Sequence, residues 1–247
     1  TSMLPETHTG VCSPAAPSLP AGEPPLATCN TPPVANDTNA TTNEDNTVTI
    51  FLSGTHADGD SLTFSIVSGP SNGSLGAIIP TGPTTATVDY SPNLNYNGAD
   101  SFVYRANDGN GGIDDATASI TINPVNDPPS FLAGPTVNVF EDSGSQTIPG
   151  WVTSISPGPS DESGQTVTFN VTNNNNALFA VQPAVSSNGT LTFTPALNAF
   201  GSATITIVAQ DNGGTANGGN NTSASQTSTI KGDGVNDEPS FTVGPDQ

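Results

Sequence analysis

Residues 91–112 read SPNLNYNGADSFVYRANDGNGG, and this stretch decides the fold because its pattern returns later in the chain. The second copy follows 103 residues further on, without gaps. A period of this length indicates tandem domains, so we expect two repeats of roughly 100 residues each. The matching pairs are Tyr90 and Phe193, Pro92 and Pro195, Asn95 and Asn198, Gly98 and Gly201, Phe102 and Ile205, Tyr104 and Ile207, Ala106 and Ala209, and Asp108 and Asp211.

The segment NDPPSF at 126–131 returns as NDEPSF at 236–241, and Glu44-Asp45 returns as Glu141-Asp142. Both segments fall at the ends of the expected repeats and therefore mark the domain boundaries. We expect a Pro-rich head at 1–33, repeats at 34–126 and 127–236, and the start of a third repeat or an unpaired strand at 237–247.

Cys12 and Cys29 lie close together in the Pro-rich head. This spacing favours one local disulfide, which would contribute on the order of 3 kcal/mol in the chain-entropy model. Free thiols are the alternative. The two cysteines by themselves do not indicate a zinc site.

Apolar residues alternate with polar ones in both repeats, as in Val48-Ile50-Leu52 and in Phe102-Tyr104-Ala106. A period of two predicts half-buried antiparallel strands, and clusters of Gly, Asn, Pro and Asp separate them as turns. About seven such strands in roughly 100 residues predict an all-β chain of immunoglobulin-like sandwiches. The last strand, expected over 229–234, is weakened by Gly232 and Gly234.

The chain has two Lys and Arg residues against 22 Asp and Glu, a formal net charge of −20. This balance excludes nucleic-acid binding, because phosphates are neutralised by Lys and Arg. It also argues against anionic membrane surfaces. No apolar run approaches the roughly 20 residues that span a bilayer, so we expect no membrane insertion. An excess of carboxylates is suited to hard cations such as Ca²⁺.

The segment HADGDSLTFSI at 56–66, the stretch at 91–112 and the junction NDPPSF together resemble the tandem cadherin-like repeats of large bacterial surface proteins. The resemblance covers residues 34–236. It implies seven-stranded Greek-key Ig/cadherin-like sandwiches, extracellular or cell-surface display, and Ca²⁺ bound at the joints between repeats.

Carboxylates that converge repel one another, so such a cluster needs a cation. In a sandwich the loops gather at two ends, where they meet the linkers. At the first junction this predicts a set from the linker and from loops of repeat two: Asn126, Asp127, Asp161, Glu162 and Asp211. The matching set at the top of repeat one is Asp58, Asp60 and Asp108.

The cadherin pattern adds an acidic residue near the first strand of the preceding repeat, which maps to Glu44, with Asp45 beside it. For the second junction the same resemblance implies Glu141, Asp142, Asn236 and Asp237 as ligands. The alternative for all these residues is that they form turns in solvated loops.

Gly69-Pro70-Ser71-Asn72-Gly73 matches G-x-S-x-G, but a nucleophile elbow needs a strand before it and a helix after it. Here a Gly/Asn turn leads to another strand, and the only candidate bases are His8 and His56. We therefore predict no catalytic residues and no enzymatic activity.

Two functional hypotheses follow. The first is a Ca²⁺-rigidified stalk or spacer of a surface adhesin, whose partners are Ca²⁺, neighbouring repeats and a surface ligand of unknown identity. The second is a self-assembling subunit of an extracellular filament or sheath, in which copies of the chain join by strand addition through terminal segments. A lectin-like binder is a third class, but no aromatic platform supports it.

Overall fold

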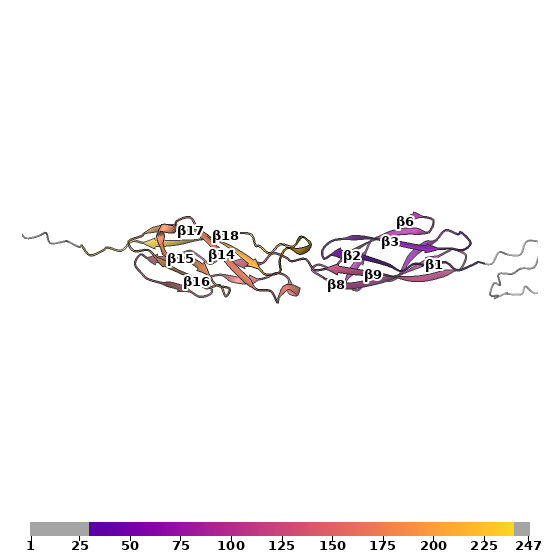
Figure 1. Ribbon diagram of the computed structural model, residues 1–247, viewed down its shortest axis with the longest axis horizontal. Coiled ribbons are helices and arrows are strands. Elements are labelled where there is room, and N and C mark those ends of the chain that lie inside the picture. The colour runs from indigo at the N-terminus through magenta and orange to yellow at the C-terminus, as the bar shows by residue number, and fades with distance from the viewer. Residues whose placement is uncertain (1–29, 240–247) are drawn as a thin grey trace, which may run out of the picture. The chain divides into compact units, whose positions relative to one another are not determined.

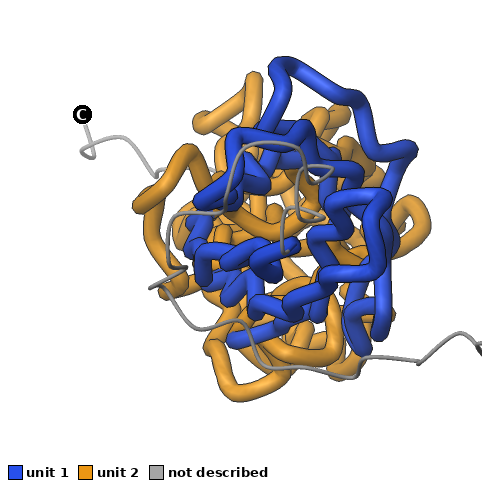
Figure 2. The backbone as a smooth tube through the Cα atoms, turned by 90° about the vertical axis from the view of Figure 1, so that its right-hand side faces the viewer, with its two compact units in different colours: residues 1–41, 47–91, 99–121 blue, residues 42–46, 92–98, 122–247 orange. Residues whose placement is uncertain are grey.

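The computed structural model describes residues 30–239, and their regular secondary structure is almost entirely β-strand. They form two compact units (Figure 2). The first unit contains residues 30–41, 47–91 and 99–121. The second contains 42–46, 92–98 and 122–239. Three short pieces of the expected first repeat, 42–46, 92–98 and 122–126, therefore belong to the second unit.

The strands of the first repeat form two sheets (Figure 1). One sheet has the order β1-β3-β7-β5, with β6 paired to β7, and the other has the order β2-β9-β8-β4. The strands are β1 (Val34–Ala35), β2 (Thr38–Asn43), β3 (Val48–Thr55), β4 (Thr63–Ser68), β5 (Gly73–Leu75), β6 (Ile79–Gly82), β7 (Thr85–Pro92), β8 (Gly98–Asn107) and β9 (Ile113–Asn123).

The predicted alternation is confirmed in these strands. Along β8 the side chains of Phe102, Tyr104 and Ala106 are buried, and the residues between them are less so. Ile50 and Leu52 of β3 are buried in the same way. Because successive side chains of a strand point to opposite faces, each sheet presents one apolar face to the core.

The second repeat repeats this plan. Its large sheet has the order β11-β18-β17-β14, and its other strands pair as β12-β16-β15 and β10-β13. Strand β11 pairs with β18 in parallel, in contrast to the antiparallel pairs around it. The strands are β10 (Ser130–Leu132), β11 (Val137–Phe140), β12 (Gln146–Ile148), β13 (Thr153–Ser156), β14 (Val167–Asn173), β15 (Phe179–Val185), β16 (Leu191–Pro195), β17 (Gly201–Asp211) and β18 (Gln226–Asp233).

Short 3₁₀ turns connect some strands of the second unit: η1 (Ser160–Glu162), η2 (Asn176–Leu178) and η3 (Ala216–Gly218). Strand β18 is a full strand despite the weakness expected from its glycines. Gly232 lies close to the backbone of Ala199, where a Cβ would come within 3.3 Å of the Ala199 carbonyl oxygen. A glycine in this strand therefore serves a close approach of two chain segments.

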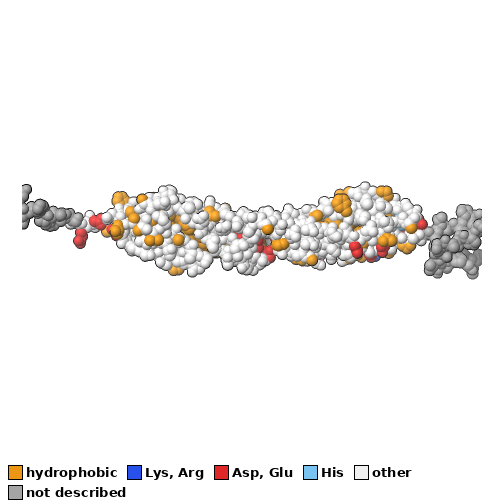
Figure 3. Space-filling model, viewed as in Figure 1, with side chains coloured by type: hydrophobic (Ala, Val, Ile, Leu, Met, Phe, Trp, Pro, Cys, Tyr) orange, Lys and Arg blue, Asp and Glu red, His pale blue; other side chains and the backbone are white. Residues whose placement is uncertain are grey.

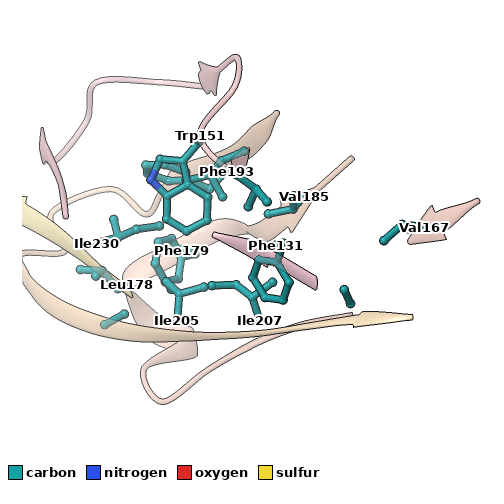
Figure 4. Close-up of a cluster of buried hydrophobic side chains, with 14 residues drawn as sticks. Phe131, Trp151, Val167, Leu178, Phe179, Val185, Phe193, Ile205, Ile207 and Ile230 are labelled. Atoms are coloured by element: carbon teal, nitrogen blue, oxygen red, sulfur yellow. The ribbon is translucent and has the colours of Figure 1, made fainter. Parts of the chain in front are cut away.

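The core of the second unit gathers side chains from all three of its sheets (Figure 4). Trp151 lies between β12 and β13, is buried, and donates its indole N–H to the carbonyl oxygen of Pro135 at 3.0 Å. Phe179 and Phe193 meet edge to face, with ring centroids 5.8 Å apart. A buried indole with a satisfied N–H is a stable arrangement, because no polar atom is left without a partner.

The internal repeat is visible in backbone geometry. Asp45 and Asp142 have φ angles of 59° and 60°, and Asn95 and Asn198 have φ angles of 55° and 56°. In both places the Asp carboxylate accepts the backbone N–H of the Asn, at 2.8 Å and 3.0 Å. The repeat found in the sequence thus reproduces strained turns as well as strands.

The predicted Cys12–Cys29 disulfide, nearly all of the head and residues 240–247 lie outside the described part of the chain. Within residues 30–239 no helix has the length and apolar character to cross a bilayer. In the view of Figure 3 the surface is mostly uncharged, with small patches of acidic and of hydrophobic atoms.

We expect Phe193→Ala to destabilise the second unit by about 3–5 kcal/mol, because it leaves a cavity in the core. Phe193 is 1% exposed, whereas Phe200 of the same unit is 72% exposed. Phe200→Ala is therefore the matched control and should change stability by less than about 0.5 kcal/mol. Trp151 is the single tryptophan, so its fluorescence in a denaturant titration reports unfolding of this unit.

Equal effects of the two variants on the free energy of unfolding would contradict the assigned core.

Candidate metal centre

Glu44 follows β2 directly and is buried, with 3% of its surface exposed. Its backbone N–H donates to the carbonyl oxygen of Asn123 at 3.0 Å. Its Oε1 accepts the backbone N–H of Val125, and its Oε2 is buried without a partner. One carboxylate oxygen thus positions the chain just before the linker, and the other has no hydrogen-bond partner.

The linker residues Asn126 and Asp127 are held by loops of the second unit. The Asn126 amide donates to Asp211 Oδ1 at 3.1 Å and to the carbonyl oxygen of Asn220 at 2.9 Å, and its Oδ1 accepts from Gln165 Nε2 at 2.8 Å. The backbone N–H of Asp127 donates to Glu162 Oε1 at 2.9 Å. An Asn side chain can do this because it both donates and accepts.

Asp161 and Glu162 come from the turn η1. Glu162 points inward and is buried, whereas Asp161 is exposed and accepts from the Asn97 amide at 2.9 Å. Gly158 gives Glu162 its room, because a Cβ at this position would lie 1.7 Å from Glu162 Oε2.

Asp211 ends β17 and is buried. Its Oδ1 accepts the backbone N–H of Gly213 at 2.9 Å as well as the Asn126 amide, and its Oδ2 has no partner. The turn after β17 therefore fixes the carboxylate with one oxygen toward the linker and leaves the second oxygen unpaired.

A cavity of about 280 Å³ lies at this place within the second unit. Acidic and amide side chains line it beside the backbone of the linker: Asn97, Pro124, Val125, Asn126, Asp161, Glu162, Gln165, Gly213, Ala216 and Asn217.

The carboxylates of this cluster disfavour one another's charge. Burial raises the pKa of Glu44, and the charges of Asp161 and Asp45 add to the rise against the hydrogen bond from Val125. Burial also raises the pKa of Glu162, helped by the charges of Asp127, Asp161 and Asp211. The pKa of Asp127 is raised for the same reasons, by burial and by Asp45 and Asp161.

The donor set fits a hard cation. Among residues 30–239, four buried side-chain oxygens near the linker have no hydrogen-bond partner: Glu44 Oε2, Glu162 Oε2, Gln165 Oε1 and Asp211 Oδ2. Glu141 Oε2, beside Val235, is a fifth such oxygen elsewhere in the unit. All are carboxylate or amide oxygens, which Ca²⁺ prefers, and an unpaired buried oxygen costs free energy unless something binds it. Within residues 30–239, however, no three His, Cys, Asp or Glu side chains converge as closely as metal ligands do.

Glu141 repeats the arrangement of Glu44. Its backbone N–H donates to the carbonyl oxygen of Asp233 at 2.9 Å, its Oε1 accepts the N–H of Val235 at 2.8 Å, and its Oε2 is unpaired. Asp142 accepts from Asn198 in the turn described above. The amide of Asn236 donates to the carbonyl oxygen of Asp237 at 3.2 Å.

The end of the first unit at Asp58, Asp60 and Asp108 differs, because protein donors already bind these carboxylates. Asp58 accepts the N–H of Thr31 at 2.7 Å, and Asp60 accepts from the Asn110 amide at 2.9 Å. Burial acts to raise the pKa of Asp108, but hydrogen bonds from Asn30, Asn110, Gly112 and His56 outweigh it and lower this pKa to about 2.

Sequence reasoning missed several side chains at these ends. Asn30, His56 and Asn97 contact the acids, and Gln165 contacts Asn126. One signal was available, since Asn30-Thr31-Pro32-Pro33 has the pattern of Asn126-Asp127-Pro128-Pro129. Gln165 and Asn97 carry no such signal, because polar loop residues are common in this chain.

The comparisons with known proteins agree with this fold. Residues 30–121 match the model of the bacterial Ig domain. The chain is similar to human protocadherin-24 EC1-2, with a TM-score of 0.57 and 17% identity over 84% of this chain and 100% of that chain. It is also similar to mouse cadherin-23 EC22-24, with a TM-score of 0.45 and 17% identity over 83% of this chain and 65% of that chain. No curated protein matches the chain.

The predicted cadherin-like and Ig-like repeats are therefore confirmed, as is the all-β sandwich fold. At 17% identity the likeness to protocadherin-24 concerns the fold alone. Ig-like and cadherin-like sandwiches are typical of surface or adhesion-type structural modules.

Glu162→Gln should raise the melting temperature of the second unit by a few degrees at neutral pH in a chelator. The folded pKa of Glu162 lies above its unfolded value, so its contribution to stability is present below the unfolded pKa and is lost as pH rises through the folded pKa. The variant removes the charge and keeps an acceptor for Asp127.

The gain should disappear below about pH 4, where Glu is protonated in the unfolded chain. Glu238→Gln is the matched control, because Glu238 is exposed. Differential scanning calorimetry over a pH series measures the effect. A loss of stability for Glu162→Gln at neutral pH in chelator would contradict the repulsion.

Proposed function

We propose that the chain is a non-catalytic structural segment of an extracellular surface protein, a stalk or spacer whose repeats at 34–126 and 127–236 are stiffened by Ca²⁺. The observation that carries this proposal is the set of buried carboxylate oxygens without partners around the 126–127 linker. A cation bound there would join the linker to the loops that hold it.

The charge balance supports a metal as the missing partner. The chain has two Lys and Arg residues, and both make ion pairs elsewhere: Arg105 with Asp115 at 2.6 Å and Lys231 with Asp233 at 2.8 Å. Neither is available to neutralise Glu44, Glu162 or Asp211. Ca²⁺ takes six to eight oxygen ligands in flexible geometry, so carboxylate, amide and backbone oxygens can all contribute.

The ligands we propose in the second unit are those predicted from the sequence, with two additions from the structure. The unpaired oxygens of Glu44, Glu162 and Asp211 would bind directly, and Gln165 Oε1 would join them. The remaining members of the set are Asn126, Asp127, Asp161, Asp45 and Asn97.

A second site would form around Glu141 with Asp142, Asn236 and Asp237. The support is the repeated geometry: Glu141 and Glu44 each bind one backbone N–H through Oε1 and leave Oε2 buried without a partner. The same local structure should bind the same kind of ion.

The mechanical consequence is that the stiffness of the linker at Asn126 and Asp127 depends on calcium. Without the ion, burial raises the pKa values of Glu44, Asp127 and Glu162, and the charges of neighbouring acidic residues such as Asp161 add to the rise. With the ion, this repulsion becomes attraction to one centre, and the linker is tied to the turn η1 and to the end of β17. A chain of such joints would hold an adhesive tip away from a cell surface.

We expect millimolar Ca²⁺ to raise the melting temperature of the second unit, because a ligand that binds only the folded state stabilises it by about 2.7 kcal/mol at 100 times its Kd. Asp211→Asn should weaken binding at least tenfold, since it replaces one charged ligand oxygen. Isothermal titration calorimetry and calorimetric melting with Ca²⁺ and with EDTA measure both effects.

Asp115→Asn is the matched control, because Asp115 pairs with Arg105 on the surface of the first unit and should not affect calcium binding. If millimolar Ca²⁺ leaves the melting temperature unchanged, the calcium proposal is wrong.

A second candidate is a self-assembling subunit of an extracellular filament or sheath. It is favoured by exposed apolar side chains on neighbouring strands of the second unit. Phe140 of β11 pairs with Asp233 of β18, and Gly201, next to Phe200, pairs with Gly232 of β18. Phe140 is 62% exposed and Phe200 is 72% exposed. The terminal segments that would add as strands lie outside the described residues.

Light scattering and negative-stain microscopy, with Ca²⁺ and then with EDTA, distinguish the two candidates. A filament subunit should form polymers that the double variant Phe140→Ser, Phe200→Ser prevents. Phe51→Ser is the control, because Phe51 is 70% exposed on the first unit. Monodisperse particles at all concentrations would favour the spacer and contradict the filament.

A further inference from the structure

We propose that the end of the first unit built from Asn30, Thr31, His56, Asp58 and Asp108 is a metal-free clasp. In this clasp the imidazole of His56 takes the place of a cation, and His56 decides that this end binds no calcium. This proposal goes beyond calcium stiffening and replaces the expectation of a cation between Asp58, Asp60 and Asp108.

The clasp has the plan of the metal centre of the second unit. The Asn30 amide donates to Asp108 at 2.7 Å, as the Asn126 amide donates to Asp211 at 3.1 Å. The N–H of the next residue in the chain, Thr31, donates to a loop carboxylate at 2.7 Å. The equivalent bond from Asp127 to Glu162 is 2.9 Å.

The turn that follows Asp108 also resembles the turn that follows Asp211. The backbone N–H of Asn110 donates to Asp108 Oδ1 at 2.7 Å, and that of Gly213 donates to Asp211 Oδ1 at 2.9 Å. The two ends share this turn bond, but the asparagine amide binds Asp108 through Oδ2 and Asp211 through Oδ1. Asp108 Oδ1 also accepts the backbone N–H of Gly112 at 2.9 Å.

They differ in the second carboxylate oxygen. Asp211 Oδ2 is buried without a partner, whereas Asp108 Oδ2 lies 2.7 Å from the Asn30 amide and 3.3 Å from His56 Nε2. The side chains of His56 and Asp108 are both fully buried. The Asn30 amide and the His56 imidazole therefore both lie at the oxygen that has no partner in the second unit.

The orientation of the ring is fixed by the backbone. The N–H groups of Asp58 and Asp60 face His56 Nδ1 at 3.3 Å and 3.4 Å. A nitrogen that accepts hydrogen bonds carries no proton, so the proton lies on Nε2 and points at Asp108. His56 is thus a built-in donor for the carboxylate.

The other groups around Asp58 and Asp108 also make a bound cation unnecessary, because they donate hydrogen bonds or fill the space. Thr31 stands where the second unit has the acidic Asp127, and its hydroxyl lies 3.3 Å from Asp58 Oδ1. Gly112 packs closely, since a Cβ there would lie 2.2 Å from Asp108 Oδ2 and 3.0 Å from the Cα of Pro32. No buried polar side-chain atom at this end, within residues 30–239, lacks a partner.

The functional consequence is that the segment 30–33 is held to the first unit at any calcium concentration, whereas the 126–127 linker depends on the ion. His56→Asn tests the stability of the clasp. It removes the Nε2 donor and should lower the calorimetric melting temperature of the first unit equally in EDTA and in Ca²⁺. An unchanged melting temperature would overturn the clasp, whether or not the chain binds calcium elsewhere.

Calcium stoichiometry tests the role of His56 directly. In calorimetric titrations with CaCl₂, Asp108→Asn should bind as many ions as the unsubstituted chain, whereas Asp211→Asn should bind fewer. His56→Asp should bind one ion more, because it adds a fourth carboxylate beside Asp58, Asp60 and Asp108. His56→Asn, which is neutral, should add none.

Two results would overturn the proposal while leaving the calcium centre of the second unit intact. The first is a loss of one bound ion in Asp108→Asn, which would show that this end is itself a calcium site. The second is an unchanged ion count in His56→Asp, which would show that His56 does not decide occupancy. If the unsubstituted chain binds no calcium, the calcium proposal fails, and the melting experiment still tests the clasp.

Discussion

A chain with 22 acidic and two basic residues cannot neutralise its buried carboxylates with its own Lys and Arg. The hydrogen bonding of the loops around Asp108 and Asp211 follows from this shortage. A buried carboxylate without partners is costly, so each one must find N–H donors or an external positive charge. The chain uses backbone N–H groups and Asn, Gln and His side chains as donors. Where these are too few, oxygens such as Glu44 Oε2 and Asp211 Oδ2 are left over.

The side chain that organises each end is an asparagine. Asn126 donates to a carboxylate and to a backbone carbonyl and accepts from Gln165, which a carboxylate in its place could not do. It thereby connects the linker to β17 and to the loops without adding charge. At the first unit Asn30 makes one comparable contact, from its amide to Asp108 Oδ2. The two ends then differ in the number of hydrogen-bond donors left for the second carboxylate oxygen. Asp108 Oδ2 has donors within the protein, whereas Asp211 Oδ2 has none and is the oxygen that we propose binds an ion.

The fold was predictable because it depends on patterns that can be read directly from the sequence, namely the alternation of apolar residues and the internal repeat. Alternation along β8 and β17 gave the buried faces, and the shared spacing from Asn95 and Asn198 gave the two repeats. The candidate site was predictable in composition: the acidic residues do lie beside the linker, and several are buried. What the sequence does not contain is the pairing of each oxygen, which depends on long-range contacts such as Gln165 with Asn126.

His56 illustrates that limit. In the sequence it stands beside Asp58 and Asp60 as an ordinary loop residue, and its contact with Asp108 joins positions 52 residues apart. Strand β18 illustrates the opposite limit, since Gly232 predicts a weak strand but allows close packing against Ala199. Local propensity is outweighed wherever tertiary contacts supply more free energy.

The parallel pairing of β11 with β18 has a mechanical consequence. Val137–Phe140 pairs in register with Ile230–Asp233, so the chain enters this pair at one end and leaves it at the other. A pulling force applied through the two flanking linkers would act along these strands in opposite directions. All the hydrogen bonds of the pair would then be sheared together, whereas a hairpin would open one bond at a time. Resistance to such a force is governed by the rate of unfolding. If the two flanking linkers were pulled apart, the pairing of β11 with the last strand, β18, would load these hydrogen bonds in shear and oppose the unfolding of the second unit.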